Sequence, residues 1–398
     1  MNILYLSALS SPKLIDELYN YNKKDPGFAV QKFNRLLAGG LVKNEEEVIV
    51  LSAPPVGRHN SSKLFWHRGQ ELEGDITYHY LNFINLPGLR QLCLTLGTFC
   101  RTLFWTISKP QKEWAVVCDV LNASMGAAAI LACKITGAQT IGVMTDMPGL
   151  MVRFETNQKM PLATRMATSL IKWCFRNYDK FVFLTEAMNV VNEYSRPYIV
   201  MEGMSDGTMV EHNKSFEHKQ VRTIMYAGGL HERYGLKKLT EAFMTLPQKN
   251  IRLKLFGTGP FVDELEKKYC KEDKRVMYMG VAPNSEVVEA ELEASLLVNP
   301  RPTHEEFTKY SFPSKNIEYM ASGTPLLTTK LPGMPKEYYP YVFLIEDETT
   351  EGYSKALAEA LNKTDEELFE YGAKAKGFVL DEKNSCEQAR RVIELIKQ

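Results

Sequence analysis

Short apolar segments alternate with stretches of helical periodicity along almost the whole chain, and this alternation restricts the fold more than any other feature. The pattern is typical of α/β proteins, in which helices join parallel strands. In the first half we expect strands at 2–7, 47–52, 76–82, 115–120, 140–145, 181–184 and 198–201. A second series is expected at 223–228, 252–256, 276–279, 296–299, 325–328 and 342–345. The sequence therefore predicts two Rossmann-like domains with parallel sheets.

The length of the chain agrees with two domains, because 398 residues exceed the usual size of a single core. Between the two strand series, residues 202–207 and the polar run 211–220 lack strong periodicity, as is usual for a connection. We place an N-terminal domain at 1–205, a C-terminal domain at 206–380 and a final helix at 381–398. The final helix has an apolar face.

Composition excludes several classes of protein. Lys and Arg together number 48, as do Asp and Glu, so the chain lacks the overall positive charge that favours nucleic acid. The seven cysteines are scattered without a C-x-x-C pair, which argues against a disulfide framework or a zinc site and favours a reducing cytoplasm. No segment approaches the roughly 20 apolar residues that span a bilayer, and the N-terminus has the pattern of a strand rather than a signal peptide.

The segment 310–325 combines a helix start, an anion site and one well-placed carboxylate. Pro313 suits the first helical position, so Ser314 and Lys315 would lie in an opening turn whose free backbone N–H groups can bind phosphate. Glu318 follows Ser314 by one turn on the same face, where the ribose of a nucleotide could lie. Gly323 should end the helix, and residues 317, 320 and 321 should take its buried face.

This segment resembles the nucleotide-sugar site of the retaining GT-B glycosyltransferases of the large family four, also called group 1. The resemblance implies two facing Rossmann-like domains with an active site in the cleft between them, an N-terminal domain for the acceptor and a C-terminal domain for the donor. In these enzymes the last helix often crosses back to the first domain. The family usually has a Glu eight positions before the ribose-binding Glu, where this chain has Tyr310.

Glycines follow three strands of the second series. Gly228 and Gly229 let a diphosphate approach the backbone, and Arg233 is the candidate cation for the leaving group, although a tight turn with an exposed arginine is an equally simple interpretation. Further candidate donor contacts are Gly257, Gly259 and Val281. Neither series contains a complete Gly-x-Gly-x-x-Gly motif with its acidic residue, which disfavours a dinucleotide oxidoreductase.

Two positions of the first domain complete the candidate site. Gly27 resembles the loop glycine that family members place beside the donor phosphate and acceptor. Asp146 follows a strand and could orient an acceptor hydroxyl, although an Asp before the Pro148-Gly149 turn is often structural. The predicted catalytic residues are thus Arg233, Lys315 and Asp146. The predicted donor-binding residues are Gly27, Gly228, Gly229, Gly257, Gly259, Val281, Tyr310, Ser314 and Glu318.

The sequence predicts a hexosyltransferase-type enzyme that moves a sugar from a UDP- or GDP-sugar to a saccharide or a polyprenol-linked saccharide, in surface polysaccharide biosynthesis. No Asp-x-Asp pair is present to hold a divalent ion, so we expect no metal and no other cofactor. The alternatives are a nucleotide-sugar epimerase or phosphorylase on the same fold, and a non-catalytic nucleotide-sugar-binding protein. We expect no nucleic-acid partner.

A membrane contact is a further hypothesis. Residues 86–105 are apolar with sparse arginines and precede Lys109 and Lys112, and the stretch 165–180 places Lys172, Arg176 and Lys180 beside Trp173 and Phe175. A buried helix between strands is the favoured interpretation of 86–105. Loose association with the inner face of the plasma membrane remains the alternative for an otherwise cytoplasmic protein.

Overall fold

The computed structural model describes residues 1–398 except 23–25, 109–113, 148–161 and 208–215. The described residues form two compact units. Unit 1 comprises Met1–Met204 together with Ser385–Gln398, and unit 2 comprises Ser205–Asn384. Several residues named above from the sequence lie outside the described ones, namely Lys109, Lys112, the Pro148-Gly149 turn and residues 211–215.

Unit 1 is built on an eight-stranded sheet with the order β10-β9-β8-β7-β1-β2-β5-β4. All neighbouring strands are parallel except β4 and β5, which pair antiparallel at one edge. The strands are β1 Asn2–Ser7, β2 Glu47–Ser52, β4 Gln70–Glu73, β5 Ile76–Tyr80, β7 Trp114–Asp119, β8 Gln139–Met144, β9 Lys180–Phe183 and β10 Tyr198–Val200. A separate antiparallel pair joins β3 Phe65–Trp66 to β6 Phe83–Ile84.

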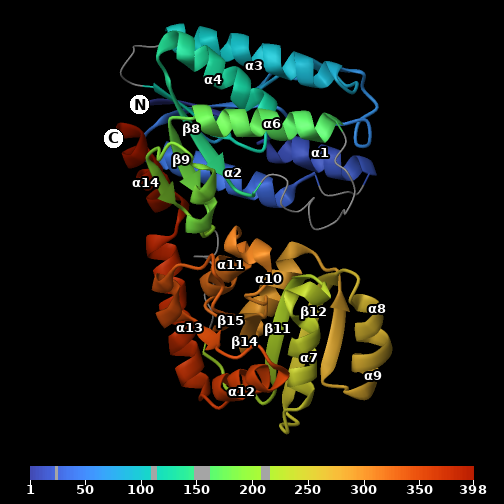
Figure 1. The fold of residues 1–398 in the computed structure, drawn as a ribbon. Helices are drawn as coiled ribbons and strands as arrows, with labels where there is room; N and C mark the ends of the chain where they lie inside the picture. The colour runs from blue at the N-terminus through green and yellow to red at the C-terminus, as the bar shows by residue number, and fades with distance from the viewer. Residues whose placement is uncertain (23–25, 109–113, 148–161, 208–215) are drawn as a thin grey trace. The chain divides into compact units, whose positions relative to one another are not determined.

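The helices of unit 1 fall into two packed groups (Figure 1). Helix α2 packs on β2 and on α14, which also contacts β9 and β10. Helix α4 packs on β7 and β8, and both α3 and α6 pack against α4. The helices are α1 Pro12–Asn22, α2 Phe28–Lys43, α3 Leu89–Ser108, α4 Ala123–Thr136, α6 Leu162–Asn177 and α14 Ser385–Lys397, with a 3₁₀ helix η1 at Glu186–Val191.

Unit 2 contains a six-stranded, fully parallel sheet with the order β13-β12-β11-β14-β15-β16. Its strands are β11 Arg222–Gly229, β12 Ile251–Thr258, β13 Val276–Gly280, β14 Leu296–Asn299, β15 Leu326–Thr329 and β16 Phe343–Ile345. Its α-helices are α7 Leu236–Met244, α8 Val262–Glu264, α9 Cys270–Glu272, α10 Asn284–Glu293, α11 Ser314–Ser322, α12 Thr350–Leu361 and α13 Asp365–Glu382. Shorter helical segments are η3 Glu232–Tyr234, η4 Leu265–Tyr269, η5 Glu306–Lys309 and η6 Lys336–Tyr341.

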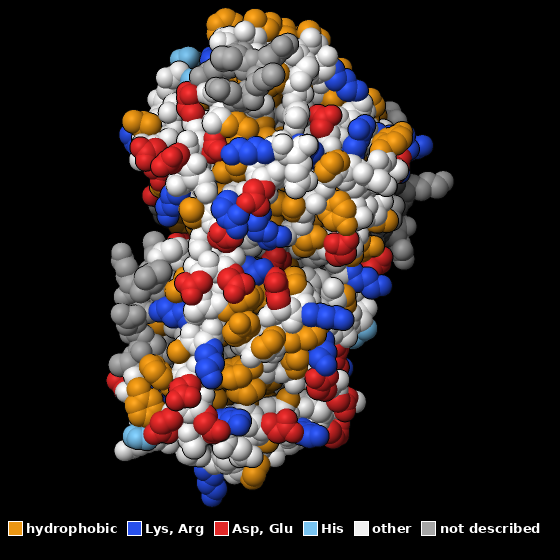
Figure 2. Space-filling model, turned by 90° about the vertical axis from the view of Figure 1, so that its left-hand side faces the viewer, with side chains coloured by type: hydrophobic (Ala, Val, Ile, Leu, Met, Phe, Trp, Pro, Cys, Tyr) orange, Lys and Arg blue, Asp and Glu red, His pale blue; other side chains and the backbone are white. Residues whose placement is uncertain are grey.

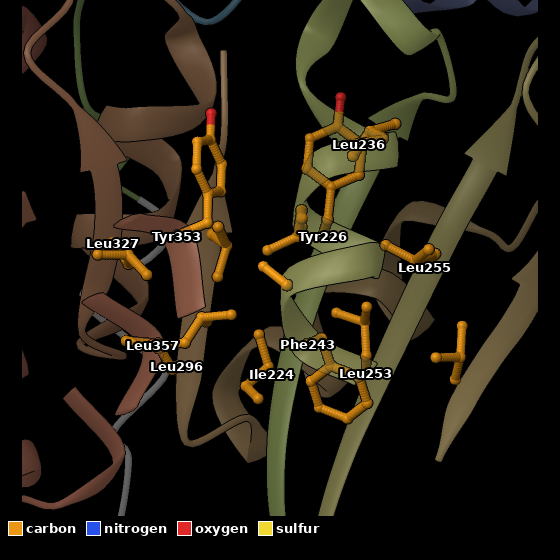
Figure 3. Packing of buried hydrophobic residues seen from close by; sticks show 14 of the residues in the cluster. Ile224, Tyr226, Leu236, Phe243, Leu253, Leu255, Leu296, Leu327, Tyr353 and Leu357 are labelled. Carbon is orange, nitrogen blue, oxygen red and sulfur yellow. The ribbon is translucent and has the colours of Figure 1, made fainter. Parts of the chain in front are cut away.

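Two apolar cores cover the two faces of this sheet. Along β11, Ile224 and Tyr226 belong to one core while Met225 and Ala227 belong to the other, as the alternation of side chains along a strand requires. The first core includes residues of α7 and α12, and the second includes residues of α11 and α13. Figure 3 shows the first core, in which the hydroxyls of Tyr226 and Tyr353 point toward the same end of the cluster.

Both predicted strand series are present in the structure, with ends that differ by at most two residues. Strands β3, β4 and β6 were not predicted, because two of them are only two residues long and the sequence Gln-Glu-Leu-Glu of β4 lacks a run of apolar residues. The helix expected within 86–105 is present as α3, between β6 and β7, but it is buried on one side only, since several of its apolar side chains face solvent.

Candidate active site

The carboxyl ends of β11, β12, β13 and β14 meet at one edge of the unit 2 sheet, the edge at which open α/β sheets bind ligands. The register places Gly228 beside Gly257. The loops that follow are joined by hydrogen bonds, in which the N–H of Leu230 donates to the carbonyl of Thr258 at 2.8 Å and that of Phe261 donates to the carbonyl of Leu230 at 3.0 Å. The two glycine loops predicted from the sequence therefore form one structure.

Two of these glycines are required by contacts between the loops. A Cβ atom at Gly257 would lie 1.8 Å from the carbonyl oxygen of Gly228, and one at Gly259 would lie 2.3 Å from that of Leu230. No side chain fits at either distance. The structure thus gives Gly257 and Gly259 a role that needs no ligand, while their contact with a donor remains a prediction.

The side chain of Lys315 lies across the end of β11. Its Cε atom is 2.6 Å from the position that a Cβ atom of Gly228 would occupy, and the hydroxyl oxygen of Tyr226 is 3.0 Å from that same position. The ammonium group lies 6.0 Å from the ring centroid of Tyr319, whose hydroxyl bonds to both the N–H and the carbonyl of Ala227. The structure therefore brings Lys315 and Gly228 together. The sequence analysis had grouped them because each residue type suits a phosphate site.

Lys315 belongs to the first turn of helix α11. Ser314 is the first helical residue and is exposed. The prediction for Pro313 was off by one position, because this residue is the N-cap, with φ −71° and ψ 111°, and therefore precedes the first turn. Gly323 ends the helix at φ 78° as predicted, and the predicted buried face is confirmed. Glu318 lies one turn after Ser314 and is half-buried.

Two arginines flank aromatic rings near the same edge. The guanidinium carbon of Arg233 lies 5.4 Å from the ring centroid of Tyr234 and 5.8 Å from that of Phe307, and the guanidinium carbon of Arg301 lies 4.9 and 5.9 Å from the same two centroids. Among the described residues, neither arginine forms an ion pair with a carboxylate, and the buried Nε of Arg233 has no hydrogen-bond partner. Such a pair of cations with unused donors suits a polyanionic ligand.

Arg301 was missed by the sequence analysis. It stands two residues after the end of β14, at the same sheet edge as the glycine loops, and this position was the available signal. Burial lowers the pKa of Arg301, and the neighbouring Arg233 lowers it further. Burial also raises the pKa of Tyr226 to about 12, an effect that the charge of Arg301 opposes. Tyr226 is therefore neutral near pH 7 and donates its hydroxyl hydrogen to the carbonyl of Gly229 at 3.1 Å.

The remaining predicted donor contacts of unit 2 lie at its surface. A Cβ atom at Gly229 would meet the His231 ring at 3.2 Å, so this turn tolerates little extra bulk. Val281 follows β13 and is 74% exposed. Tyr310 caps the end of η5 and is half-buried, with its N–H donating to the carbonyl of Phe307 at 3.1 Å. The structure assigns no ligand contact to any of the three.

Gly27 and Asp146 belong to unit 1, so the cluster of unit 2 is assembled without them. Gly27 precedes α2 in the left-handed conformation at φ 93°, which favours glycine. Asp146 is exposed after β8, where its Oδ1 accepts a hydrogen bond from the N–H of Met147 at 2.8 Å. Their proposed roles remain predictions.

Within the described residues, no group of three or more His, Cys, Asp or Glu side chains is arranged to hold a metal ion. The groups at this edge that can bind phosphate are the N-terminus of α11 and three cations, Arg233, Arg301 and Lys315. The edge thus combines a helix N-terminus, two joined glycine loops and three cationic side chains from separate segments of unit 2.

The fold matches solved glycosyltransferases along its whole length. The apo structure of OtsA aligns with a TM-score of 0.66 at 11% identity. The alignment covers 100% of this chain and 99% of the OtsA chain. Sucrose-phosphate synthase from Thermosynechococcus elongatus gives 0.64 at 13% identity, and the lipopolysaccharide outer core galactosyltransferase WaaB gives 0.62 at 12%, each with the same coverage. The chain thus has the GT-B fold, with two Rossmann-like units.

A family model narrows the class. Residues 209–377, which span most of unit 2, match the family described as glycosyl transferases group 1. This match covers less than half of the chain, so the comparisons show the fold of the whole chain and the similarity of unit 2 to this family. A comparison with curated protein sequences gave no match.

Proposed function

We propose that the protein transfers a hexosyl group from a UDP- or GDP-sugar to a saccharide or a lipid-linked saccharide, with retention of configuration at the transferred carbon, in surface polysaccharide biosynthesis. The observation that carries the donor part is the placement of Lys315 across Gly228 at the N-terminus of α11. A solved structure of similar fold, described as trehalose-6-phosphate from E. coli, is bound with UDP-2-fluoro glucose, which supports a uridine donor.

The proposed roles follow from charge and position. The backbone N–H groups of Ser314 and Lys315 and the three cations would bind the diphosphate and stabilise it as it departs. Glu318, one turn further along α11, would accept hydrogen bonds from the ribose hydroxyls. Tyr310 would offer its hydroxyl to the sugar, and Asp146 would orient the acceptor.

Retention would follow from front-face attack, in which the leaving phosphate takes the acceptor proton, so no enzyme nucleophile is required. Helix dipole and cations would replace a metal ion in neutralising the phosphate. The proposed place of action is the cytoplasm, including the inner face of the plasma membrane. Within the described residues, no helix is long and apolar enough to cross a bilayer.

The test is calorimetric titration of the wild type, Glu318→Ala and Lys315→Ala with UDP, GDP, ADP and CMP. We expect one nucleotide to bind selectively. Glu318→Ala should weaken its binding by about 1.5–3 kcal/mol, the usual cost of losing a hydrogen bond to a charged group. Lys315→Ala should weaken binding of the diphosphate more than that of the nucleoside alone. Lys249→Ala serves as the control, because Lys249 is an exposed lysine of unit 2 that precedes β12 and is therefore at the opposite end of this strand from the glycine loops.

Two outcomes would contradict the proposal. Unchanged nucleotide affinity in Glu318→Ala would remove its ribose role. Tight donor binding without sugar transfer to any saccharide or lipid acceptor would favour a non-catalytic binding protein, and interconversion of the donor without an acceptor would favour an epimerase or phosphorylase.

A further inference from the structure

Helix α3 exposes a row of apolar side chains, although its buried side holds Leu94 and Trp105 together with threonines. Threonines occupy its buried side, where Thr98 and Thr102 have no exposed surface. Its solvent-facing side carries an apolar stripe, in which Leu96 is 56%, Phe104 75% and Ile107 69% exposed. Leu89 and Leu92 extend this stripe toward the start of the helix. A surface helix normally turns such residues toward the core.

The buried side of α3 does not compensate for this exposure. The hydroxyl oxygens of Thr98 and Thr102 and the indole nitrogen of Trp105 are buried and have no hydrogen-bond partner among the described residues. Burying polar groups without partners is unfavourable, as is leaving the leucines and Phe104 in water. An apolar surface of this kind marks an interaction site.

The three helices α3, α4 and α6 form a continuous packed layer, with α4 in contact with both of the others. Further apolar side chains of the layer are exposed, namely Leu131 and Ile135 of α4 and Met166 of α6. Figure 2 shows hydrophobic side chains gathered at the top of the view, the edge where Figure 1 places α3 and α4. We call these three helices the helical layer.

The helical layer differs from the rest of the chain in its charged residues. The three helices contain no Asp or Glu but six basic residues, Arg90, Arg101, Lys134, Arg165, Lys172 and Arg176, in a chain whose net charge is zero. Among the described residues, Arg176 is the one of the six that forms an ion pair with a carboxylate, that of Glu193 at 2.8 Å. An apolar stripe bordered by basic residues fits an anionic lipid bilayer better than a protein surface of mixed charge.

Two residues that suggested a membrane contact from the sequence are excluded from this surface. Lys180 is buried, and its ammonium donates to the carbonyls of Leu395 and Ile396 at 2.9 Å each, so it caps α14. Phe175 is also buried. The observed surface rests on α3 and its neighbours, not on the end of α6.

A pocket of about 1300 Å³ opens between the first turns of α3 and α4, residues 165–171 of α6 and the carboxyl ends of β2 and β7. Its lining is mostly apolar and includes Leu92, Met166 and Leu170. Arg90 also lines it; one of its Nη atoms donates to the carbonyl of Pro54 at 3.1 Å, while its buried Nε has no partner among the described residues. No acidic residue belongs to the described lining. A mostly apolar pocket with an arginine donor suits the hydrocarbon chain and phosphate of an anionic lipid.

We infer that the helical layer docks on an anionic bilayer, with the stripe of α3 inserted between lipids, and that the pocket takes the hydrocarbon chain of a lipid phosphate. The pocket part rests on the proposed function, because it selects the lipid-linked class among the acceptors proposed above. The bilayer part stands on the helical layer alone.

The test of docking is sedimentation with vesicles of phosphatidylcholine alone and of equal parts phosphatidylcholine and phosphatidylglycerol. We expect the wild type to bind the anionic vesicles, to bind them less at high salt, and not to bind the neutral ones. Phe104→Glu should weaken binding at least about tenfold, since it places a charge where an aromatic side chain would insert. Leu72→Glu is the matched control, because Leu72 is 73% exposed on β4 of the same unit.

Cys100 offers a direct reporter of insertion. It follows Leu96 by one turn on α3 and is the exposed member of the seven cysteines. A polarity-sensitive fluorophore attached there should shift to shorter wavelength with anionic vesicles and show no shift with neutral ones. Binding of the wild type to neither kind of vesicle, or equal binding by Phe104→Glu, would overturn docking. A wild type that forms dimers disrupted by Phe104→Glu would instead show that a second copy covers the stripe.

The pocket is tested with farnesyl phosphate below its aggregation concentration, with farnesol and inorganic phosphate as the comparison ligands. We expect farnesyl phosphate to bind more tightly than either, and Arg90→Gln and Arg165→Gln each to reduce that advantage several-fold. Equal binding of farnesol and farnesyl phosphate, or no binding of either, would overturn the pocket assignment. Nucleotide titration of the same variants reports separately on the donor site, so failure of the pocket and failure of the proposed function are distinguishable.

Discussion

At the scale of single residues, the carboxyl edge of the unit 2 sheet gathers cations from segments that are distant in the sequence. Arg233 and Arg301 are 68 positions apart in the sequence and lie beside the same two rings. A sequence pattern can nominate Lys315 and Glu318, since both lie on one short helix with a recognisable start. The one signal for Arg301 is its position after β14, and that position does not separate it from an ordinary surface arginine that follows a strand.

Asp119 shows the opposite case, a buried carboxylate that no motif indicates. It ends β7 and is 2% exposed, and its oxygens accept hydrogen bonds from the N–H of Leu121 at 3.0 Å and from the side-chain nitrogen of Asn122 at 3.2 Å. Burial raises its pKa to about 6 against these hydrogen bonds. A carboxyl group with a raised pKa contributes stability that is present below its unfolded pKa of about 3.9 and is lost as pH rises through about 6.

We therefore predict that Asp119→Asn stabilises unit 1 relative to the wild type at neutral pH and not at about pH 4. The difference in the free energy of unfolding should change by roughly 3 kcal/mol between these limits, the energy of a shift of about two pKa units. Urea unfolding across the pH range measures it. Asp16→Asn, at an exposed position of α1, should give a flat difference. A flat difference for Asp119→Asn as well would show that its carboxyl group is not destabilised by burial.

At the scale of elements, the parallel strands were predictable because they are buried runs of apolar residues. All six residues of β7 are buried, for example, and both faces of such a strand need apolar side chains. The exposure of α3 was not predictable, because its spacing of apolar residues is that of any helix packed on a sheet. Only the three-dimensional packing shows that Thr98 and Thr102 lie inside while Leu92 and Leu96 lie outside.

The junction of β11 and β12 gives a prediction at the same scale. Gly257→Ala should destabilise unit 2 by about 3 kcal/mol or more, because its Cβ atom would overlap the Gly228 carbonyl and its φ of 124° is unfavourable for alanine. Gly280→Ala should cost only about 1 kcal/mol, since φ is 73° but no atom lies within 4 Å of the added Cβ. Urea unfolding of the two variants compares them. Equal losses would mean that backbone conformation alone, and not the contact between the strands, makes Gly257 necessary.

At the scale of the whole molecule, the order of the chain does not follow the two units, because the last helix returns to unit 1. Val392 of α14 and Val379 of the preceding helix α13 are both fully buried, yet they belong to different units. Replacing either by Ala should cost about 1–3 kcal/mol through the cavity that it leaves. We predict that Val392→Ala accelerates hydrogen exchange in β1 and β9 while Val379→Ala accelerates it in β11 and β14, measured by mass spectrometry in mild denaturant. Each variant is the control for the other. If both accelerated exchange equally in all four strands, the units would unfold as one, and the assignment of α14 to unit 1 would have no energetic meaning.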